Sequence, residues 1–441
     1  MDEKYARRLG YSVIAASWLA VFCLFGFRSS FSILNPVMIK STGWAATLPS
    51  TGYSIMMSVY AITAFFSGMI IDKHGTRPAY LLGAIFSGLG FGLTSLVPNS
   101  QPYLYLALYG IFAGVGTGML WVSSTVSVRK WFVGKAYATW WGVAFMGAPM
   151  AQVILSLVVK PILTNPASGA DSWRVAMRIL AVIMFVALLL AAAVAKKTPE
   201  DYKLKPFGLV PAKPGTVAQE EYPWSPKTAF KTLPIWGTVG AFLTAMIGEF
   251  LIWTQVVRFW TVDAKMDLAT ATNLYIFIGI SGIITMPLMG RIADMLVGKL
   301  GNETKARKVM LIFAPAVGVL ACLTLLASGA GNFAIGIVAC VLFAIYWAIE
   351  PGGCAGYAGS IYGRKSLGKI WGLATLIVMG IGPALGTYVG SAMGASGSYV
   401  PSVRFALGAF AISTIVALAL PLAAKVPQEQ HESISAAVKL G

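Results

Sequence analysis

The chain has 441 residues, of which 57% are hydrophobic and only 11% are charged. Soluble domains are normally about one-quarter charged, so this composition excludes an ordinary water-soluble domain. The 33 Lys and Arg residues against 16 Asp and Glu leave a net charge of +17. A nucleic-acid-binding protein would carry such a charge on a polar surface, whereas here the cations lie between long apolar stretches.

Twelve apolar stretches follow one another along the chain. A helix of roughly 20 residues crosses the hydrocarbon core of a bilayer, so each stretch predicts a transmembrane helix. The first is too long for the apolar part of a signal peptide. The predicted spans are 12–37, 50–71, 78–97, 102–127, 137–160, 173–195, 235–258, 269–292, 309–328, 333–358, 370–393 and 402–424.

The spans divide into two halves joined by a polar segment that is rich in proline and charge. We expect an N-terminal six-helix bundle over 1–195, a cytoplasmic linker over 196–234, a C-terminal six-helix bundle over 235–424 and a cytoplasmic tail over 425–441. Lys and Arg concentrate in the loops on the side of the termini, which predicts that both termini are cytoplasmic. The expected location is the cell membrane, meaning the inner membrane if the source is a Gram-negative bacterium.

The two halves resemble each other in sequence. Residues 135–149 open the fifth span and 369–383 open the eleventh, and both begin with Lys and reach a Pro fourteen residues later. Residues 68–72 (Gly-Met-Ile-Ile-Asp) close the second span, and 290–294 (Gly-Arg-Ile-Ala-Asp) close the eighth. The predicted fold is therefore an all-α membrane protein of 12 transmembrane helices in two pseudo-symmetric bundles. Such repeats place a substrate site at their interface near the middle of the bilayer.

Residues 68–77 carry a recognisable motif, Gly-Met-Ile-Ile-Asp-Lys-His-Gly-Thr-Arg. It resembles the G-x-x-x-D-x-x-G-x-R signature between the second and third helices of major facilitator superfamily transporters. The first Gly allows close helix approach, the Asp can pair with a cation or a helix N-terminus, and the second Gly permits a tight turn. The motif positions expected to act in gating are Gly68, Asp72, Gly75, Arg77, Gly290 and Asp294.

A narrower resemblance is to the monocarboxylate transporters and the related oxalate:formate antiporter branch. Residues 25–32 look like that branch's first helix, and 131–135 look like the junction before its fifth helix. The resemblance implies a carrier of small organic anions. The chain departs from the branch in the eighth helix, where Gly282 and Met286 replace an Asn and a substrate-binding Arg. It also lacks the oxalate exchanger's lysine in the eleventh span. Trp121 stands where relatives tend to have a cavity-lining Tyr.

Four charged residues, Arg28, Arg178, Glu249 and Glu350, lie deep inside predicted spans, where ionisable side chains are usually functional. The repeat offset places Glu249 opposite Phe27, next to Arg28, so we expect Arg28 and Glu249 to face each other across a central cavity. Arg28 would bind a carboxylate through its planar donor fork, and Glu249 would carry a proton. A permanent Arg28–Glu249 salt bridge that only joins the halves is the alternative. Arg178 is expected to reach the membrane surface.

Glu350 is a second proton-coupling candidate because Pro351 directly follows it and should kink or break the tenth helix. A partner for freed backbone donors and a gate residue are the alternatives for Glu350. Helical spacing and aromatic character select the other candidates. The complete set of substrate-binding candidates is Arg28, Phe31, Asn35, Trp121, Trp253, Tyr346 and Tyr357.

The sequence thus predicts a secondary active transporter for a small organic anion, most specifically a proton-coupled monocarboxylate symporter that works by alternating access. An organic-anion exchanger without a proton and a proton-driven efflux antiporter for a lipophilic compound are the alternatives. An enzyme is not expected, because no metal constellation, phosphate loop or nucleophile motif is present, and no cofactor is expected. The expected partners are the anion, protons and the lipid bilayer, with no nucleic acid and a monomeric functional unit.

Overall fold

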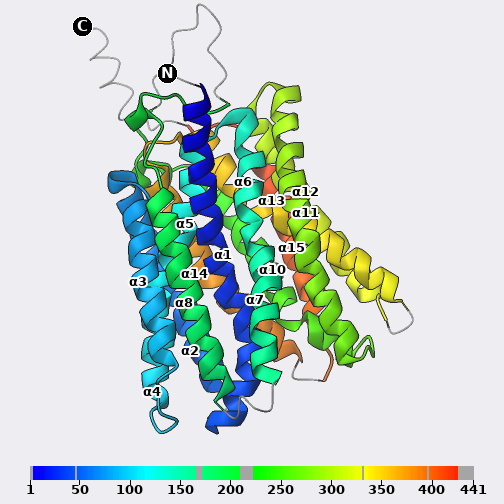
Figure 1. Ribbon diagram of the computed structural model, residues 1–441. Helices are drawn as coiled ribbons and strands as arrows, with labels where there is room; N and C mark the ends of the chain where they lie inside the picture. The colour runs from blue at the N-terminus through cyan, green and yellow to red at the C-terminus, as the bar shows by residue number, and fades with distance from the viewer. Residues whose placement is uncertain are drawn as a thin grey trace, which may run out of the picture.

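A computed structural model of the protein describes residues 3–44, 47–164, 171–208, 222–329, 332–394 and 397–425. Over these residues the regular structure is helical, apart from one isolated β-bridge between Phe132 and Phe207. The long helices run side by side along one direction (Figure 1). This arrangement confirms the predicted all-α fold.

The first bundle contains six helical spans. They are α1 (Glu3–Thr42); α2 (Thr47–His74); α3 (Arg77–Thr94); α4 (Pro102–Tyr105), η1 (Leu106–Phe112) and α5 (Ala113–Trp131) in succession; η2 (Gly134–Ala136), α6 (Tyr137–Phe145) and α7 (Gly147–Thr164) in succession; and α8 (Ser172–Val194).

The linker contains two short helices, η4 (Glu200–Tyr202) and α9 (Pro226–Ala229), before the second bundle begins. The six spans of that bundle are α10 (Leu233–Val262), α11 (Leu268–Leu300), α12 (Glu303–Ala327), α13 (Phe333–Tyr362), α14 (Leu367–Gly394) and α15 (Val400–Ala419).

Eleven spans among the described residues are long and apolar enough to cross a membrane. The remaining predicted span corresponds to α3, whose 18 residues begin with Arg77 and Pro78. At about 1.5 Å per residue, α3 is still roughly 27 Å long. The outer faces of the helices carry apolar side chains that a bilayer would cover, among them Ile62, Leu157, Val182, Ile284 and Ile415.

The two bundles meet through α2 with α14 and through α6 and α7 with α11. Gly68 of α2 lies so close to α14 that a Cβ at this position would overlap the carbonyl oxygen of Gly368. Gly290 of α11 lies equally close to the carbonyl oxygen of Ala138 in α6. The two repeated motifs therefore occupy equivalent positions, and their glycines permit the close helix contacts that hold this end of the interface together.

α1 begins at the end of the bundle that the linker covers, and we call this end the terminal face (Figure 1). The first part of the linker is fixed to the first bundle there. Phe207 accepts a hydrogen bond from the backbone N–H of Val133 and donates one to the carbonyl of Trp131, both at 2.8 Å. Its ring stacks on Phe132 with centroids 5.3 Å apart. The linker is thus packed on the junction between α5 and α6.

Candidate functional site

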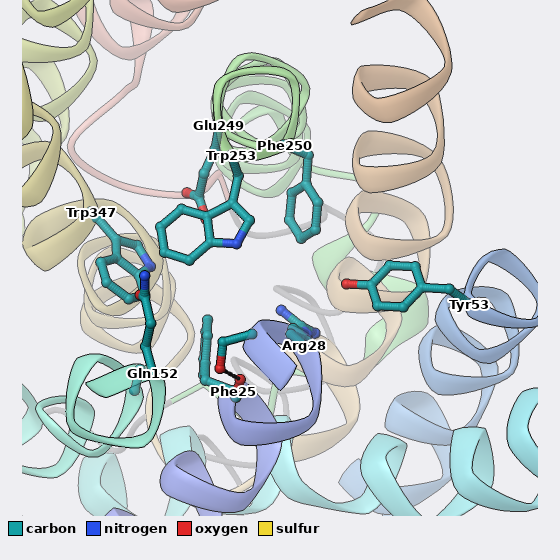
Figure 2. A pocket seen from close by; sticks show the side chains of 10 residues that line it. Phe25, Arg28, Tyr53, Gln152, Glu249, Phe250, Trp253 and Trp347 are labelled. Carbon is teal, nitrogen blue, oxygen red and sulfur yellow. Dashed lines mark hydrogen bonds between the residues drawn. The ribbon is translucent and has the colours of Figure 1, made fainter. Parts of the chain in front are cut away.

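A small cavity lies between the two bundles. Figure 2 shows its polar and aromatic side chains converging from both bundles. The first bundle contributes Phe25, Arg28 and Ser29 from α1, Tyr53 from α2, and Ala148 and Gln152 from α7. The second bundle contributes Glu249, Phe250 and Trp253 from α10, and Trp347 from α13.

Arg28 is the one cation among the residues that line this cavity. Its side chain is buried, and among the described residues its Nε and Nη2 atoms have no hydrogen-bond partner. Its Cζ atom instead lies 5.0 Å from the ring centres of Phe25 and Tyr60, and 5.9 Å from those of Phe27 and Phe250. Cation–π contacts offset only part of the cost of burying a charge. An anion that entered the cavity would supply the missing counter-charge.

Glu249 lines the same cavity from the opposite bundle, and it is also buried. The hydroxyl of Tyr346, on α13, donates to its Oε2 at 3.0 Å. The ion pairs that the structure shows among its described residues do not include Arg28 with Glu249. The two predicted charges therefore share one cavity, and in this conformation each remains available for a third group.

Three other predicted substrate-binding residues lie at or near the cavity. Trp253 forms part of its wall. Tyr346 lies behind Glu249 and reaches the cavity only through that carboxylate. The ring of Phe31 packs on Tyr53 with centroids 4.7 Å apart, one layer away from the cavity. The side chain of Asn35 lies outside the described part of the structure.

Two other predicted substrate-binding residues do not line this cavity. Trp121 is fully buried and packs edge-on against Trp141 and Phe145. The hydroxyl of Tyr357 donates to the carbonyl of Pro421, beyond the end of α15. Trp121 is thus one ring away from the cavity wall, since Phe145 in turn contacts Phe25 and Trp347.

Several residues of the cavity wall were not predicted from the sequence. Phe25 and Ser29 lie close to Arg28 on the side of α1 that faces the cavity, and Phe250 follows Glu249 directly. Tyr53 and Gln152 come from α2 and α7, where no charged residue in the middle of the span indicated which positions lie at the depth of the cavity. Proximity in sequence to Arg28 and Glu249 was a usable signal for the first three, and no comparable signal was available for the others.

Glu350 lies on α13 but not in the cavity wall. It is fully buried, and its Oε1 atom accepts a hydrogen bond from the thiol of Cys354 at 3.5 Å. Its Oε2 atom has no partner among the described residues. Of the predicted kink or break at Pro351, the break does not occur, since α13 continues to Tyr362. Neighbouring side chains support the helix there, and Tyr137 donates to the carbonyl of Gly352 at 2.9 Å.

Asp72 joins the two bundles at the terminal face. Its carboxylate accepts hydrogen bonds from the backbone N–H groups of Gly368 at 3.2 Å and Lys369 at 2.8 Å, at the start of α14. It also forms an ion pair with Lys130 at 3.0 Å. A carboxylate at a helix N-terminus interacts favourably with the helix dipole and satisfies free N–H groups. Gly75 has φ +81°, as the predicted turn requires, and Arg77 begins α3 with an exposed side chain.

Asp294 makes the equivalent contact between α11 and α6. Its carboxylate accepts from the backbone N–H groups of Ala138 at 2.9 Å and Thr139 at 2.6 Å. It pairs with Arg307 of α12 at 3.0 Å, and both side chains are buried. Together with the Asp72 contact, this arrangement closes the cavity on the terminal face.

The sequence profile of the Major Facilitator Superfamily matches residues 17–387. Among curated relatives, the hexuronate transporter of Bacillus subtilis (strain 168) is 25% identical over 92% of this chain and 94% of its own length. A probable hexose phosphate transport protein of Chlamydia trachomatis (26% identical) matches 46% of this chain and 42% of its own length. Monocarboxylate transporter 14 of Homo sapiens (23%) matches 34% of this chain and 29% of its own length. The chain thus spans less than half of the last two relatives.

Solved structures share the fold at low sequence identity. The proton:xylose symporter XylE superposes with a TM-score of 0.70 and 13% identity, covering 96% of this chain and 97% of that protein. The transporter FucP in the outward conformation superposes with a TM-score of 0.65 and 15% identity, covering 93% of this chain and 99% of that protein.

Proposed function

Because the chain belongs to the Major Facilitator Superfamily, whose members are transporters rather than enzymes, we propose that it is a proton-coupled symporter for a small monocarboxylate. In this proposal Arg28 binds the carboxylate and Glu249 carries the proton. The protein lies in the cell membrane with both termini in the cytoplasm. It is active as a monomer.

The observation that carries the proposal is the buried, partly unpartnered guanidinium of Arg28 in the central cavity. An uncompensated charge inside a membrane protein costs several kcal/mol or more. The planar guanidinium presents two parallel N–H donors that match the two oxygens of a carboxylate. A bound monocarboxylate would therefore neutralise the charge and use the free donors at the same time.

Proton coupling is supported by Glu249, which shares the cavity with Arg28 but does not pair with it. In its ionised form the Glu249 carboxylate disfavours a second anion in the same small cavity, because unlike water the surroundings screen charge weakly. Protonation removes that repulsion. A carboxylate and a proton would then be bound together, which is the requirement for symport.

Alternating access follows from where the bundles touch. The contacts of Asp72 and Asp294 close the terminal face, so substrate would reach Arg28 from the opposite face in this conformation. Rocking of the 1–195 bundle against the 235–424 bundle would break those contacts and open the terminal face. With cytoplasmic termini, this cycle would deliver the anion and the proton to the cytoplasm.

Uptake into proteoliposomes tests the proposal. With an inward proton gradient, the wild-type protein should accumulate a labelled monocarboxylate, and Arg28→Lys should lose most of this uptake because the planar donor fork is gone. Glu249→Gln should abolish accumulation but retain exchange of labelled for unlabelled substrate. Glu350→Gln is the matched change of a second buried carboxyl. If Glu350→Gln and not Glu249→Gln abolishes accumulation, Glu350 is the proton carrier.

The same measurements separate the alternative functions. If the wild-type protein exchanges labelled for unlabelled substrate at a rate that does not depend on pH, this would support an anion exchanger. Thermal stabilisation by lipophilic cations and by no organic acid would support an efflux antiporter. Either result would contradict symport of a monocarboxylate.

A further inference from the structure

We propose that the cavity selects a carboxylate with a flat, apolar body, such as an aromatic acid, over hydroxylated acids including the sugar acids. This inference rests on the proposed role of Arg28 as the anion site, and it names the class of substrate which that site takes. It depends on two properties of the cavity wall. Aromatic rings surround Arg28, and most polar side chains of the wall already form hydrogen bonds within the protein.

Aromatic rings form a nearly continuous surface beside the guanidinium. Trp253 and Trp347 have ring centroids 5.0 Å apart at an interplanar angle of 55°. Trp347 in turn lies 5.7 Å from Phe25, whose ring is 5.0 Å from the Cζ atom of Arg28. Phe250 lies 5.9 Å from the same atom on the other side. Figure 2 shows Trp253 and Phe250 facing Arg28 and Phe25 across the cavity.

The position of these rings determines what the rest of a bound anion would contact. A carboxylate paired with Arg28 would project its body between the rings of Phe25 and Phe250 and toward the two tryptophans. Flat apolar groups pack well between such rings, in offset or edge-to-face arrangements. A substrate of this shape would bury apolar surface on both of its faces.

The polar side chains of the wall offer few donors to hydroxyl groups. The hydroxyl of Ser29 donates to the backbone carbonyl of Phe25 at 3.0 Å, and the amide of Gln152 donates to the carbonyl of Tyr275 at 3.4 Å. The carboxylate of Glu249 already accepts from Tyr346. The hydroxyl of Tyr53 points into the cavity beside Arg28, where it can serve a carboxylate oxygen (Figure 2).

A sugar acid carries several hydroxyl groups that lose hydration when it enters the cavity. Buried hydroxyl groups without partners are strongly unfavourable, and sites that bind them provide matching polar groups. The two phenyl rings offer no hydrogen-bonding group, and each indole offers a single N–H donor and no acceptor, which is too few for a polyhydroxylated ring. The wall therefore favours an aromatic monocarboxylate over a hexuronate, although a hexuronate transporter is among the relatives.

Binding to the purified full-length protein tests the inference with four defined acids. Benzoate is flat and apolar, cyclohexanecarboxylate is apolar but not flat, lactate is small and hydroxylated, and glucuronate is a sugar acid. We expect benzoate to bind about tenfold or more tightly than lactate or glucuronate, and more tightly than cyclohexanecarboxylate. This comparison uses the unchanged protein.

Variants of two tryptophans on α10 locate the effect. Trp253→Leu removes a ring of the cavity wall and should weaken benzoate binding about tenfold while changing lactate binding by less than about twofold. Trp236→Leu is the matched control, because Trp236 is half exposed on the same helix and does not line the cavity. Equal losses of benzoate and lactate binding in Trp253→Leu would contradict a wall that recognises the apolar body.

The outcomes distinguish this inference from the proposed function. If glucuronate or lactate binds more tightly than benzoate and Arg28→Lys abolishes that binding, the substrate class is wrong but the anion site stands. If cyclohexanecarboxylate binds as tightly as benzoate, the selection for flatness is wrong. If no acid binds in a way that depends on Arg28, both the substrate class and the proposed anion site are wrong.

Discussion

Replacing Asp294 with Asn should shift the protein toward a conformation that is open at the terminal face. In the closed conformation the carboxylate accepts two backbone N–H groups from α6, at 2.9 and 2.6 Å, across the boundary between the bundles. An Asn side chain has one acceptor oxygen, so its amide group would face the second N–H. The substitution therefore removes both the charge and one of the two acceptors, without changing the size of the side chain.

The size of the shift follows from these two hydrogen bonds. Hydrogen bonds to charged groups contribute about 1.5–3 kcal/mol each, and a neutral one contributes about 1 kcal/mol. Two charge-assisted bonds replaced by one neutral bond weaken the closed conformation by about 2–5 kcal/mol. The Arg307 partner lies in the same bundle, and it retains contacts to Gly134 and Glu303. We therefore expect the ratio of closed to open molecules to fall by a factor of about 30 to 5,000.

Spin labels on opposite bundles can measure this shift. Lys73, at the end of α2, and Lys365, just before α14, are both exposed at the terminal face. The four native cysteines are buried, so cysteines introduced at these two positions should be labelled selectively. The distance between the labels should lengthen in Asp294→Asn, although neither label lies on α11.

The matched control is Asp267→Asn, at the other end of α11. Asp267 caps that helix by accepting from the backbone N–H of Thr270 at 2.9 Å, and Asn is an equally good capping residue. This control should leave the distance distribution unchanged. A folded Asp294→Asn protein with the wild-type distance distribution would refute the assignment of Asp294 as a contact that closes the terminal face.

Three further changes act at the same face. Combining Asp294→Asn with Asp72→Asn should open the terminal face further than either change alone. The two effects on the free energy of closing should nearly add, because the two contacts lie on different helix pairs. The distances between the spin labels measure this. Gly290→Ala should also favour opening, since its methyl group would overlap a carbonyl oxygen of the opposite helix, whereas Gly298→Ala meets only a flexible lysine and should show the wild-type distances. Phe207→Ala should release the start of the linker, so limited proteolysis should cut that segment faster; an unchanged rate would contradict its packing on the first bundle.

The fold was predictable because apolar length is a property of the sequence alone. The positions of the spans follow from the thickness of a bilayer, but their ends do not. The first span was predicted over 12–37, whereas α1 extends from Glu3 to Thr42. Helices continue beyond the hydrocarbon core as long as caps and neighbouring helices satisfy their polar ends, and hydropathy does not register those residues.

The candidate site could be predicted only at and near charged residues, because a charge inside an apolar span is unusual enough to indicate a functional position. The repeat offset placed Arg28 and Glu249 at matching positions, and both line the same cavity. Trp121 and Tyr357 do not line it, and a helix that is apolar on every side gives no signal of which side faces the cavity. Tyr53 and Trp347 were missed for the same reason, since only tertiary packing fixes the rotation of α2 and α13.

The partners of the two motif aspartates indicate how closing can be both specific and reversible. Asp72 of α2 pairs with Lys130 of α5, and Asp294 of α11 pairs with Arg307 of α12, so each ion pair lies within one bundle. Of the contacts that these two carboxylates make, only the hydrogen bonds to the N-terminal N–H groups of α14 and α6 cross between the bundles. When the bundles separate, each buried carboxylate therefore keeps its cation and avoids the large cost of an unpaired charge. Opening also breaks the Arg129–Glu303 ion pair and the Arg307–Gly134 hydrogen bond, which join α12 to the first bundle. The free energy of opening is therefore the sum of these contacts and the helix-terminus hydrogen bonds, and a bound substrate can offset part of it.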